Sequence, residues 1–266
     1  MAAASPARVV RSMVLVALAT LVACGCASAP GATPAGVARS LTPMATAGGA
    51  AGGPAPGTTP AGAAGTTPGA PRTFRAEVWA DNWFALYANG RLVGQDSVPI
   101  TTERSFNAET ITFSATYPLT IAMVTRDYME TDGGLEYIGT SRQQVGDGGF
   151  IAQVWDVAAG RVASATGPRW HGLVLQRAPL NPACAAASNP ATACRSESVA
   201  EPAGWQAPGF DDAAWPTATV YTAAQVGTKE GYDTIRWDPS AALIWSADLR
   251  LDNVIAWRST VAAPPS

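Results

Sequence analysis

The sequence is poor in histidine and in charge, and each shortage argues against a class of site. His171 is the only histidine among the 266 residues, so a zinc centre built on histidines or a histidine-based catalytic triad is hard to assemble. Charged residues make up 14% of the chain and the formal net charge is −3, whereas an average soluble protein is about 25% charged. Because the chain has no excess of basic side chains, we expect no nucleic-acid partner.

Motifs of the common enzyme classes are also missing. The sequence contains no G-x-S-x-G elbow, no P-loop, no H-E-x-x-H, and no G-x-G-x-x-G between a strand and a helix. No long segment follows the 3.6-residue period of an amphipathic helix. These absences predict a β-rich, non-catalytic protein without an organic cofactor.

Residues 1–23 have the layout of an export signal. Arg8 and Arg11 precede an apolar run over residues 13–23, which is about half as long as a membrane-spanning helix. The run ends in Leu21-Val22-Ala23-Cys24, which resembles the lipobox of bacterial lipoproteins. The resemblance implies acylation of Cys24 and a lipoprotein anchored in the bacterial cell envelope, at its outer surface or in the periplasm. The alternative is ordinary signal cleavage near Ala27-Ser28-Ala29.

Residues 24–71 consist almost entirely of alanine, glycine, proline and threonine. Such a segment cannot bury enough apolar surface to offset the entropy of ordering it. We therefore predict a disordered tether that lifts residues 72–266 off the membrane, to which the lipid alone attaches the protein. The remaining ~195 residues are enough for one β domain with a substantial core.

Alternation of apolar and polar side chains predicts strands throughout residues 72–266. The clearest signal is a hairpin around Asn89-Gly90, a pair that favours a type I′ turn. Residues 119–125 are continuously apolar and predict a central strand covered on both faces. Short strands separated by turn signals indicate an antiparallel β-sandwich or a barrel. The predicted strands are residues 73–80, 83–88, 91–95, 109–115, 119–125, 150–157, 161–165, 169–175, 217–222, 242–245 and 254–259.

Cys184 and Cys194 are the two cysteines of the predicted domain. In an exported chain this pairing favours a disulfide, which would pin the long irregular segment around it. The alternative, a pair of metal-binding thiols, lacks further ligands.

Two segments resemble one family. Residues 80–93 (ADNWFALYANGRLV) and residues 205–218 (WQAPGFDDAAWPTA) are similar to two motifs of galactose-binding-like β-jelly rolls, the sugar-binding domains attached to glycoside hydrolases. The resemblance implies a jelly-roll sandwich and carbohydrate binding. It also implies that Asp212 caps a turn and that three aromatic residues plug one end of the sandwich: Trp205, Phe210 and Trp215. From the turn signal at Pro208-Gly209 we expect Phe210 and Trp215 to be largely buried. The two motifs occur here in the reverse of the usual order, which leaves the strand topology open.

Polar residues beside tryptophan form the candidate glycan contacts. Sugar rings stack on tryptophan faces while neighbouring polar groups bond the hydroxyls. Two clusters fit, Asp81-Asn82-Trp83 and Trp170-His171. The alternative is that most of the nine tryptophans belong to the core.

The connection over residues 126–149 carries the candidate calcium ligands, because carboxylates on a glycine-bearing loop suit that ion. The spacing of an EF-hand is absent, and the same acids could form a solvated loop or, alternatively, the acid pair of a glycosidase. The candidates are Asp127, Glu130, Asp132, Glu136 and Asp147.

Taken together, these patterns favour a cell-envelope lipoprotein that presents a non-catalytic carbohydrate-binding β-sandwich. Two alternatives stay open: a structural or protein-interaction domain of the envelope without a sugar site, and a small glycan hydrolase.

Overall fold

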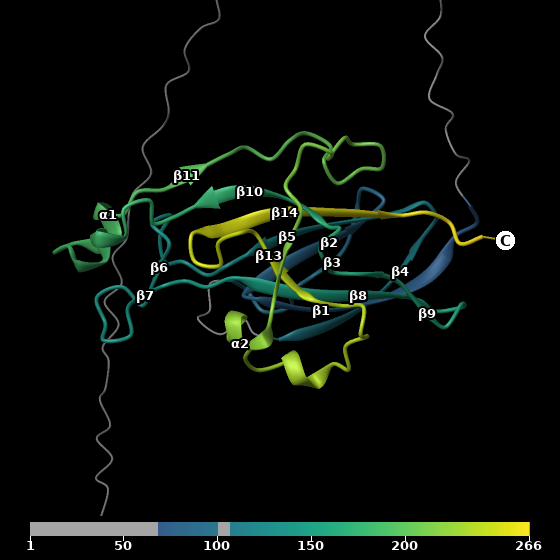
Figure 1. Cartoon of the computed structure of the whole chain (residues 1–266), viewed down its shortest axis with the longest axis horizontal. Coiled ribbons are helices and arrows are strands. Elements are labelled where there is room, and N and C mark those ends of the chain that lie inside the picture. The colour runs from purple at the N-terminus through teal and green to yellow at the C-terminus, as the bar shows by residue number, and fades with distance from the viewer. Residues whose placement is uncertain (1–68, 101–106, 266) are drawn as a thin grey trace, which may run out of the picture. The chain divides into compact units, whose positions relative to one another are not determined.

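The computed structural model describes residues 69–100 and 107–265, which form two antiparallel β-sheets packed face to face (Figure 1). The first strand begins at Arg72, the residue at which the domain was predicted to start. The predicted signal peptide, the lipidation candidate Cys24 and nearly all of the predicted tether lie outside the described residues.

The first sheet, called sheet A here, has the strand order β12-β13-β8-β1-β4, and β9 pairs with β8. Its ladders are all antiparallel among the described residues. The strand bounds are Arg72–Asp81 for β1, Ala108–Ala115 for β4, Gly149–Asp156 for β8, Arg161–Ala165 for β9, Thr219–Tyr221 for β12 and Leu243–Trp245 for β13.

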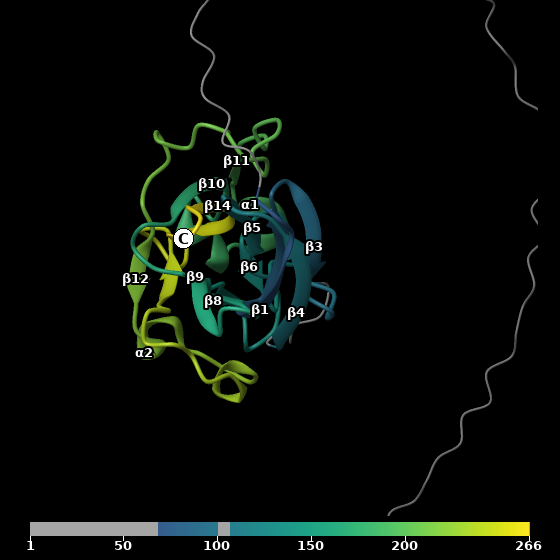
Figure 2. The same ribbon diagram turned by 90° about the vertical axis from the view of Figure 1, so that its right-hand side faces the viewer.

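The second sheet, sheet B, has the order β11-β10-β14-β5-β2-β3 and is also antiparallel. The chain passes repeatedly between the two sheets, as in a jelly roll, and the end view shows them as two layers (Figure 2). The bounds are Trp83–Ala88 for β2, Arg91–Gln95 for β3, Leu119–Arg126 for β5, His171–Arg177 for β10, Glu197–Ser198 for β11 and Asp252–Val261 for β14.

The remaining elements are short. A two-stranded ladder joins β6 (Leu135–Glu136) to β7 (Gln144–Val145). The helical turns are η1 (Pro182–Ala186), α1 (Pro190–Ala193), α2 (Ala223–Val226) and η2 (Tyr232–Thr234), which agrees with the missing helical period. Within the described ranges, no helix is long and apolar enough to cross a membrane.

The core between the sheets is built around aromatic side chains. The ring of Phe150 on β8 lies 5.4 Å from that of Trp257 on β14 and 6.5 Å from that of Trp245. The indole N–H groups of these tryptophans are paired: Trp257 donates to Thr125 Oγ1 at 2.9 Å and Trp245 to the Asp252 carbonyl at 2.8 Å. The core therefore buries large apolar area without leaving indole donors unsatisfied.

The predicted hairpin is confirmed. The strands β2 and β3 flank Asn89 and Gly90, whose φ angles of 49° and 83° are those of a left-handed turn. The Asn89 side chain also fixes the turn to the neighbouring strand, since its Oδ1 accepts from Thr120 N at 2.8 Å. The predicted central strand is confirmed as well, because β5 lies between β14 and β2 and is buried on both faces.

The predicted disulfide is confirmed too. It joins Cys184 in η1 to Cys194 just after α1, with their Cα atoms 5.0 Å apart. The bond closes a short loop, so it holds this irregular segment together rather than the sandwich core.

Candidate functional site

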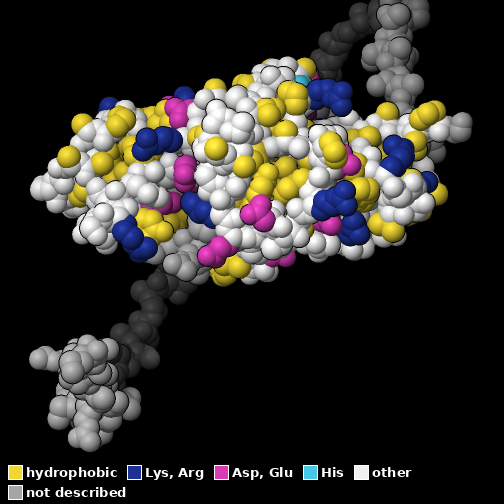
Figure 3. Space-filling view, turned by 60° about the horizontal axis from the view of Figure 1, so that its bottom comes forward, with side chains coloured by type: hydrophobic (Ala, Val, Ile, Leu, Met, Phe, Trp, Pro, Cys, Tyr) yellow, Lys and Arg dark blue, Asp and Glu magenta, His cyan; other side chains and the backbone are white. Residues whose placement is uncertain are grey.

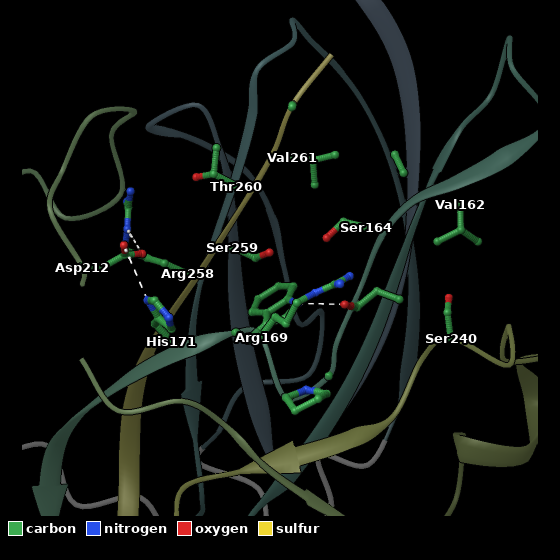
Figure 4. Close-up of a pocket in the computed structure, with 16 residues that line it drawn as sticks. Val162, Ser164, Arg169, His171, Asp212, Ser240, Arg258, Ser259, Thr260 and Val261 are labelled. Atoms are coloured by element: carbon green, nitrogen blue, oxygen red, sulfur yellow. Dashed lines mark hydrogen bonds and ion pairs between the residues drawn. The ribbon is translucent and has the colours of Figure 1, made fainter. Parts of the chain in front are cut away.

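A cavity of about 920 Å³ opens between sheet A and sheet B near the end of β14 (Figure 4). This volume lies within the usual range for small-molecule sites, about 300–1,000 Å³. One wall is β9 and the turn that leads to His171, and the other is the end of β14. The lining comprises residues 162–165, 167–171, 212, 240 and 258–262.

The polar lining of the cavity includes four hydroxyl side chains and the exposed guanidinium of Arg169. In Figure 4 the Arg169 side chain lies near Ser164 and Ser259. Ser240 and Thr260 also line the cavity, but their hydroxyls have partners outside the lining: Ser240 Oγ donates to Asp238 Oδ1 at 2.6 Å, and Thr260 Oγ1 lies 3.1 Å from Thr120 Oγ1. Val162 and Val261 add apolar surface to the lining. The cavity therefore combines one exposed guanidinium, that of Arg169, with hydroxyls that can both donate and accept hydrogen bonds.

Asp212, His171 and Arg258 form the far side of the cavity. Arg258 is only 2% exposed, and its Nε donates to Asp212 Oδ2 at 3.0 Å. His171 Nδ1 lies 3.6 Å from Asp212 Oδ1. His171 and Arg258 are partners in the β10–β14 register, so the sheet itself brings both basic side chains to the same carboxylate.

Arg258 also holds the segment that precedes Asp212. Its guanidinium donates to the main-chain carbonyls of Trp205 and Ala207, the latter at 3.2 Å. It donates to the Phe210 carbonyl at 3.4 Å and lies 5.3 Å from the centre of the Phe210 ring. A buried guanidinium needs such partners, so one side chain fixes residues 205–212 against sheet B.

The predicted aromatic plug is wrong in its location. Trp205 is 1% exposed, but Phe210 and Trp215 are only partly buried. Together they pack on the outer face of sheet B, against Ala122, Val124 and Ala256, instead of closing an end of the sandwich. The reason is that these small apolar residues of β5 and β14 need a cover on the side away from sheet A.

The predicted cap at Asp212 is also wrong. The Asp212 carboxylate pairs with Arg258 and does not bond a main-chain N–H. Asp211 takes the capping position instead, because its Oδ1 accepts from Ala213 N at 3.1 Å. The turn into Trp215 does form, with Trp215 N donating to the Asp212 carbonyl at 2.9 Å.

The structure separates the predicted glycan contacts. Both His171 and Trp170 line the cavity. Trp170 is only 2% exposed, and its Nε1–H donates to the Ala165 carbonyl at 2.8 Å. Trp170 is thus a wall of the cavity and offers no ring face for stacking. Asp81, Asn82 and Trp83 lie at the junction of β1 and β2 and do not line the cavity.

The polar groups of that second cluster are engaged within the fold. Asp81 is 1% exposed, and burial raises its pKa to about 8, against the opposing effect of Lys229, whose Nζ lies 3.3 Å away. Asn82 Oδ1 accepts from the main-chain N–H of Tyr128. The guanidinium of Arg126 lies 5.3 Å from the centre of the Trp83 ring. These contacts support a structural role at this end of the sandwich.

The five predicted calcium ligands do not form one group. Asp127 and Glu136 are buried, while Asp132 is exposed and Glu130 accepts from Ile138 N at 2.8 Å. Asp147 is partly exposed and lies 3.7 Å from Lys229 Nζ. In the part of the chain that the structure describes, no three Asp, Glu, His or Cys side chains converge as a metal centre.

The cavity residues that the sequence did not single out come from segments far apart in the chain. They are Ser164, Arg169, Ser240, Arg258, Ser259 and Thr260. Only for Arg169 did the sequence suggest a site residue, because it directly precedes the Trp170-His171 pair. The other residues belong to no motif, because the fold alone brings their segments together.

A second polar and aromatic surface lies on the outer face of sheet A. Trp155 is partly exposed, and its Nε1 donates to Glu77 Oε2 at 3.1 Å. The neighbouring Gln153 donates to the same oxygen at 2.6 Å, and Arg75 lies 5.8 Å from the centre of the Trp155 ring. This group is the alternative platform for a sugar ring.

The charges on the face shown in Figure 3 are mixed, with acidic and basic side chains interspersed. Comparison with known proteins adds no assignment: no family model, curated protein or solved structure matches the chain.

The role of Arg258 can be tested by Arg258→Met. Removing one partner from a buried ion pair and its carbonyl acceptors should lower the free energy of unfolding by about 3–5 kcal/mol. Urea unfolding followed by tryptophan fluorescence measures this loss. Arg250→Met, the same change at an exposed arginine, serves as the control, and equal stability of the two variants would contradict the assignment.

Proposed function

We propose that residues 72–266 form a non-catalytic glycan-binding domain whose ligand occupies the cavity between β9 and β14. The observation that carries this proposal is the exposed guanidinium of Arg169 in a cavity of about 920 Å³ that Ser164 and Ser259 also line. A cavity of this size and polarity fits one or two sugar rings.

The chemistry of the lining matches the chemistry of sugars. Sugar hydroxyls donate and accept hydrogen bonds, as serine and threonine hydroxyls do. Arg169 is exposed, and among the described residues it has no acidic partner. Because guanidinium groups bind carboxylates in a bidentate manner, this arginine favours a glycan that contains an acidic sugar such as a uronic acid.

Binding is favoured over hydrolysis because the cavity lining contains a single carboxylate, that of Asp212. This carboxylate is already engaged by Arg258 at 3.0 Å. Glycoside hydrolysis usually needs two carboxyl groups about 5–10 Å apart on either side of the bond to be cleaved. Of the acids around Asp127, Asp81 and Glu136 are buried as Asp127 is, and Asp147 alone is partly exposed, so that group offers no exposed pair of carboxyl groups.

We further propose that the protein is exported and held in the cell envelope by a lipid on Cys24. The support is the lipobox-like sequence that ends the apolar run of residues 13–23. The domain would then sample glycans near the membrane to which it is attached. The low net charge of −3 and the mixed surface of Figure 3 give no support to a nucleic-acid partner.

The glycan proposal predicts a specific loss of binding in Arg169→Ala. Acidic oligosaccharides on a glycan array should bind the wild type, and Arg169→Ala should weaken this binding about tenfold or more, which corresponds to the loss of one charge-assisted contact. Neutral oligosaccharides of the same length should be affected less.

Arg161→Ala is the matched control, since Arg161 is exposed on β9 but does not line the cavity. This variant should bind like the wild type. If wild-type protein bound no glycan on the array, the structural or protein-interaction alternative would be favoured. If it released reducing sugar from a bound glycan, the hydrolase alternative would replace the proposal.

The anchor proposal predicts the fate of Cys24→Ala. Without the acylated cysteine the chain should accumulate as unprocessed precursor or leave the membrane fraction in soluble form. Fractionation and mass spectrometry of the wild type should show a diacyl or triacyl chain that begins at Cys24. A wild-type mature chain that begins at residue 27 or later and carries no lipid is the contradicting result.

A further inference from the structure

At the end of β14 that lies away from the cavity, three buried acceptor oxygens have no hydrogen-bond partner. They are both carboxylate oxygens of Asp127 and the amide oxygen of Asn253. Each residue is 1% exposed. Buried polar groups are nearly always paired, because leaving one unsatisfied costs free energy. The three oxygens therefore mark a place where the fold needs a donor or a cation.

The two residues are direct neighbours across the sheet. Asp127 N donates to the Asn253 carbonyl at 2.8 Å, one step beyond the β5–β14 pair Arg126 and Val254. Side chains of directly opposed residues lie on the same face, with Cβ atoms about 4.5–5.5 Å apart. By the alternation of the strands, that face is the inner one, on which Thr125 and Trp257 also meet.

The amide of Asn253 is held in one orientation. Its Nδ2 donates to Gln176 Oε1 at 2.9 Å and to the Ala178 carbonyl at 3.0 Å. Because both donor contacts require the nitrogen on that side, Oδ1 has to remain on the other side as an acceptor. Asn253 therefore cannot rotate to offer its N–H groups to Asp127.

The main chain closes tightly over the Asp127 carboxylate. A Cβ atom placed on Gly146 would lie 2.0 Å from Asp127 Oδ2, so the connection from β7 to β8 leaves no room for a side chain there. Two further acids, Asp147 and Glu136, lie near enough to act on Asp127 by their charge. Burial is the largest cause of the raised pKa of Asp127, and the charges of Asp81, Glu136 and Asp147 add to it.

The nearby basic side chain is directed to other acids. Lys229 Nζ lies 3.3 Å from Asp81 Oδ2 and 3.7 Å from Asp147 Oδ1. Its charge also acts on Asp127 and lowers the pKa of that carboxyl, but no hydrogen bond joins it to either oxygen of Asp127. The site around Asp127 thus has three buried acceptor oxygens that no donor of the described residues satisfies.

We propose that Asp127 and Asn253 bind a calcium ion, with the Asp127 carboxylate and Asn253 Oδ1 as side-chain ligands and main-chain carbonyls completing the shell. Calcium accepts six to eight oxygens of mixed type, including amides and carbonyls, in flexible geometry. Such a mixed set needs only one carboxylate, so it is compatible with the finding that no three acidic side chains converge among the described residues.

The ion would join β5 to β14 at the point where both strands end and the long connection of residues 127–148 begins. A cation at this place would hold the β6–β7 connection against the sandwich. We therefore expect a stabilising site that lies apart from the glycan cavity, so its test is independent of glycan binding.

The test compares calcium with a chelator in the wild type and two variants of the purified mature chain. About 5 mM calcium chloride should raise the Tm of the wild type by roughly 5 °C or more over the value in EDTA. Asp127→Asn removes the ligand charge with almost no change of shape, and it should abolish this difference. Asp132→Asn makes the same change at an exposed residue of the same connection and should retain the full difference.

The competing explanation is a proton on Asp127 that is shared with Asn253. In that case the Tm of the wild type would be the same in calcium and in EDTA, and Asp127→Asn would be as stable as the wild type. Equilibrium dialysis of the wild type with radioactive calcium provides a second readout that does not depend on the variant folding. One ion bound per chain supports the proposal, and no bound calcium at about 10 mM overturns it.

Discussion

The burial of the Arg258 guanidinium is the interaction on which the candidate site and the cover of sheet B both depend. A charge that is 2% exposed is stable only when its donors are paired. The pairs it finds are Asp212 and three main-chain carbonyls from residues 205–210. The same contacts place Trp205 on the outer face of sheet B and Asp212 in the cavity wall. A change at this arginine should therefore affect the packing of the sheet and the shape of the cavity together.

Much of the fold could be predicted because strands depend on local alternation. The hairpin followed from the preference of Asn89-Gly90 for positive φ angles, and both residues have them. The continuous apolar run of residues 119–125 indicated a strand covered on both faces, and β5 is such a strand. The run therefore already implied a covering segment on the outer face of sheet B. It did not identify residues 205–215 as that segment.

The site could be predicted only in part, because it depends on contacts between distant segments. The motif around Trp205 correctly indicated an aromatic cluster, but its location depends on Arg258, which looks like any arginine in an alternating strand. Ser164 and Ser259 line one cavity only because the fold brings β9 of sheet A close to the end of β14 in sheet B. Asp127 and Asn253 likewise become neighbours only through the register of β5 with β14. Composition and spacing carry no information about such pairs.

The central claim, that the cavity between β9 and β14 is the glycan site, is tested most directly by mapping amide chemical shifts in the presence of the tightest-binding glycan. The account predicts that the largest changes fall on residues 162–171 and 258–262, with little change near Trp155 on the outer face of sheet A. Changes centred on Arg75, Glu77 and Trp155 would show that the ligand binds the partly exposed tryptophan instead, and would contradict the assignment of the cavity.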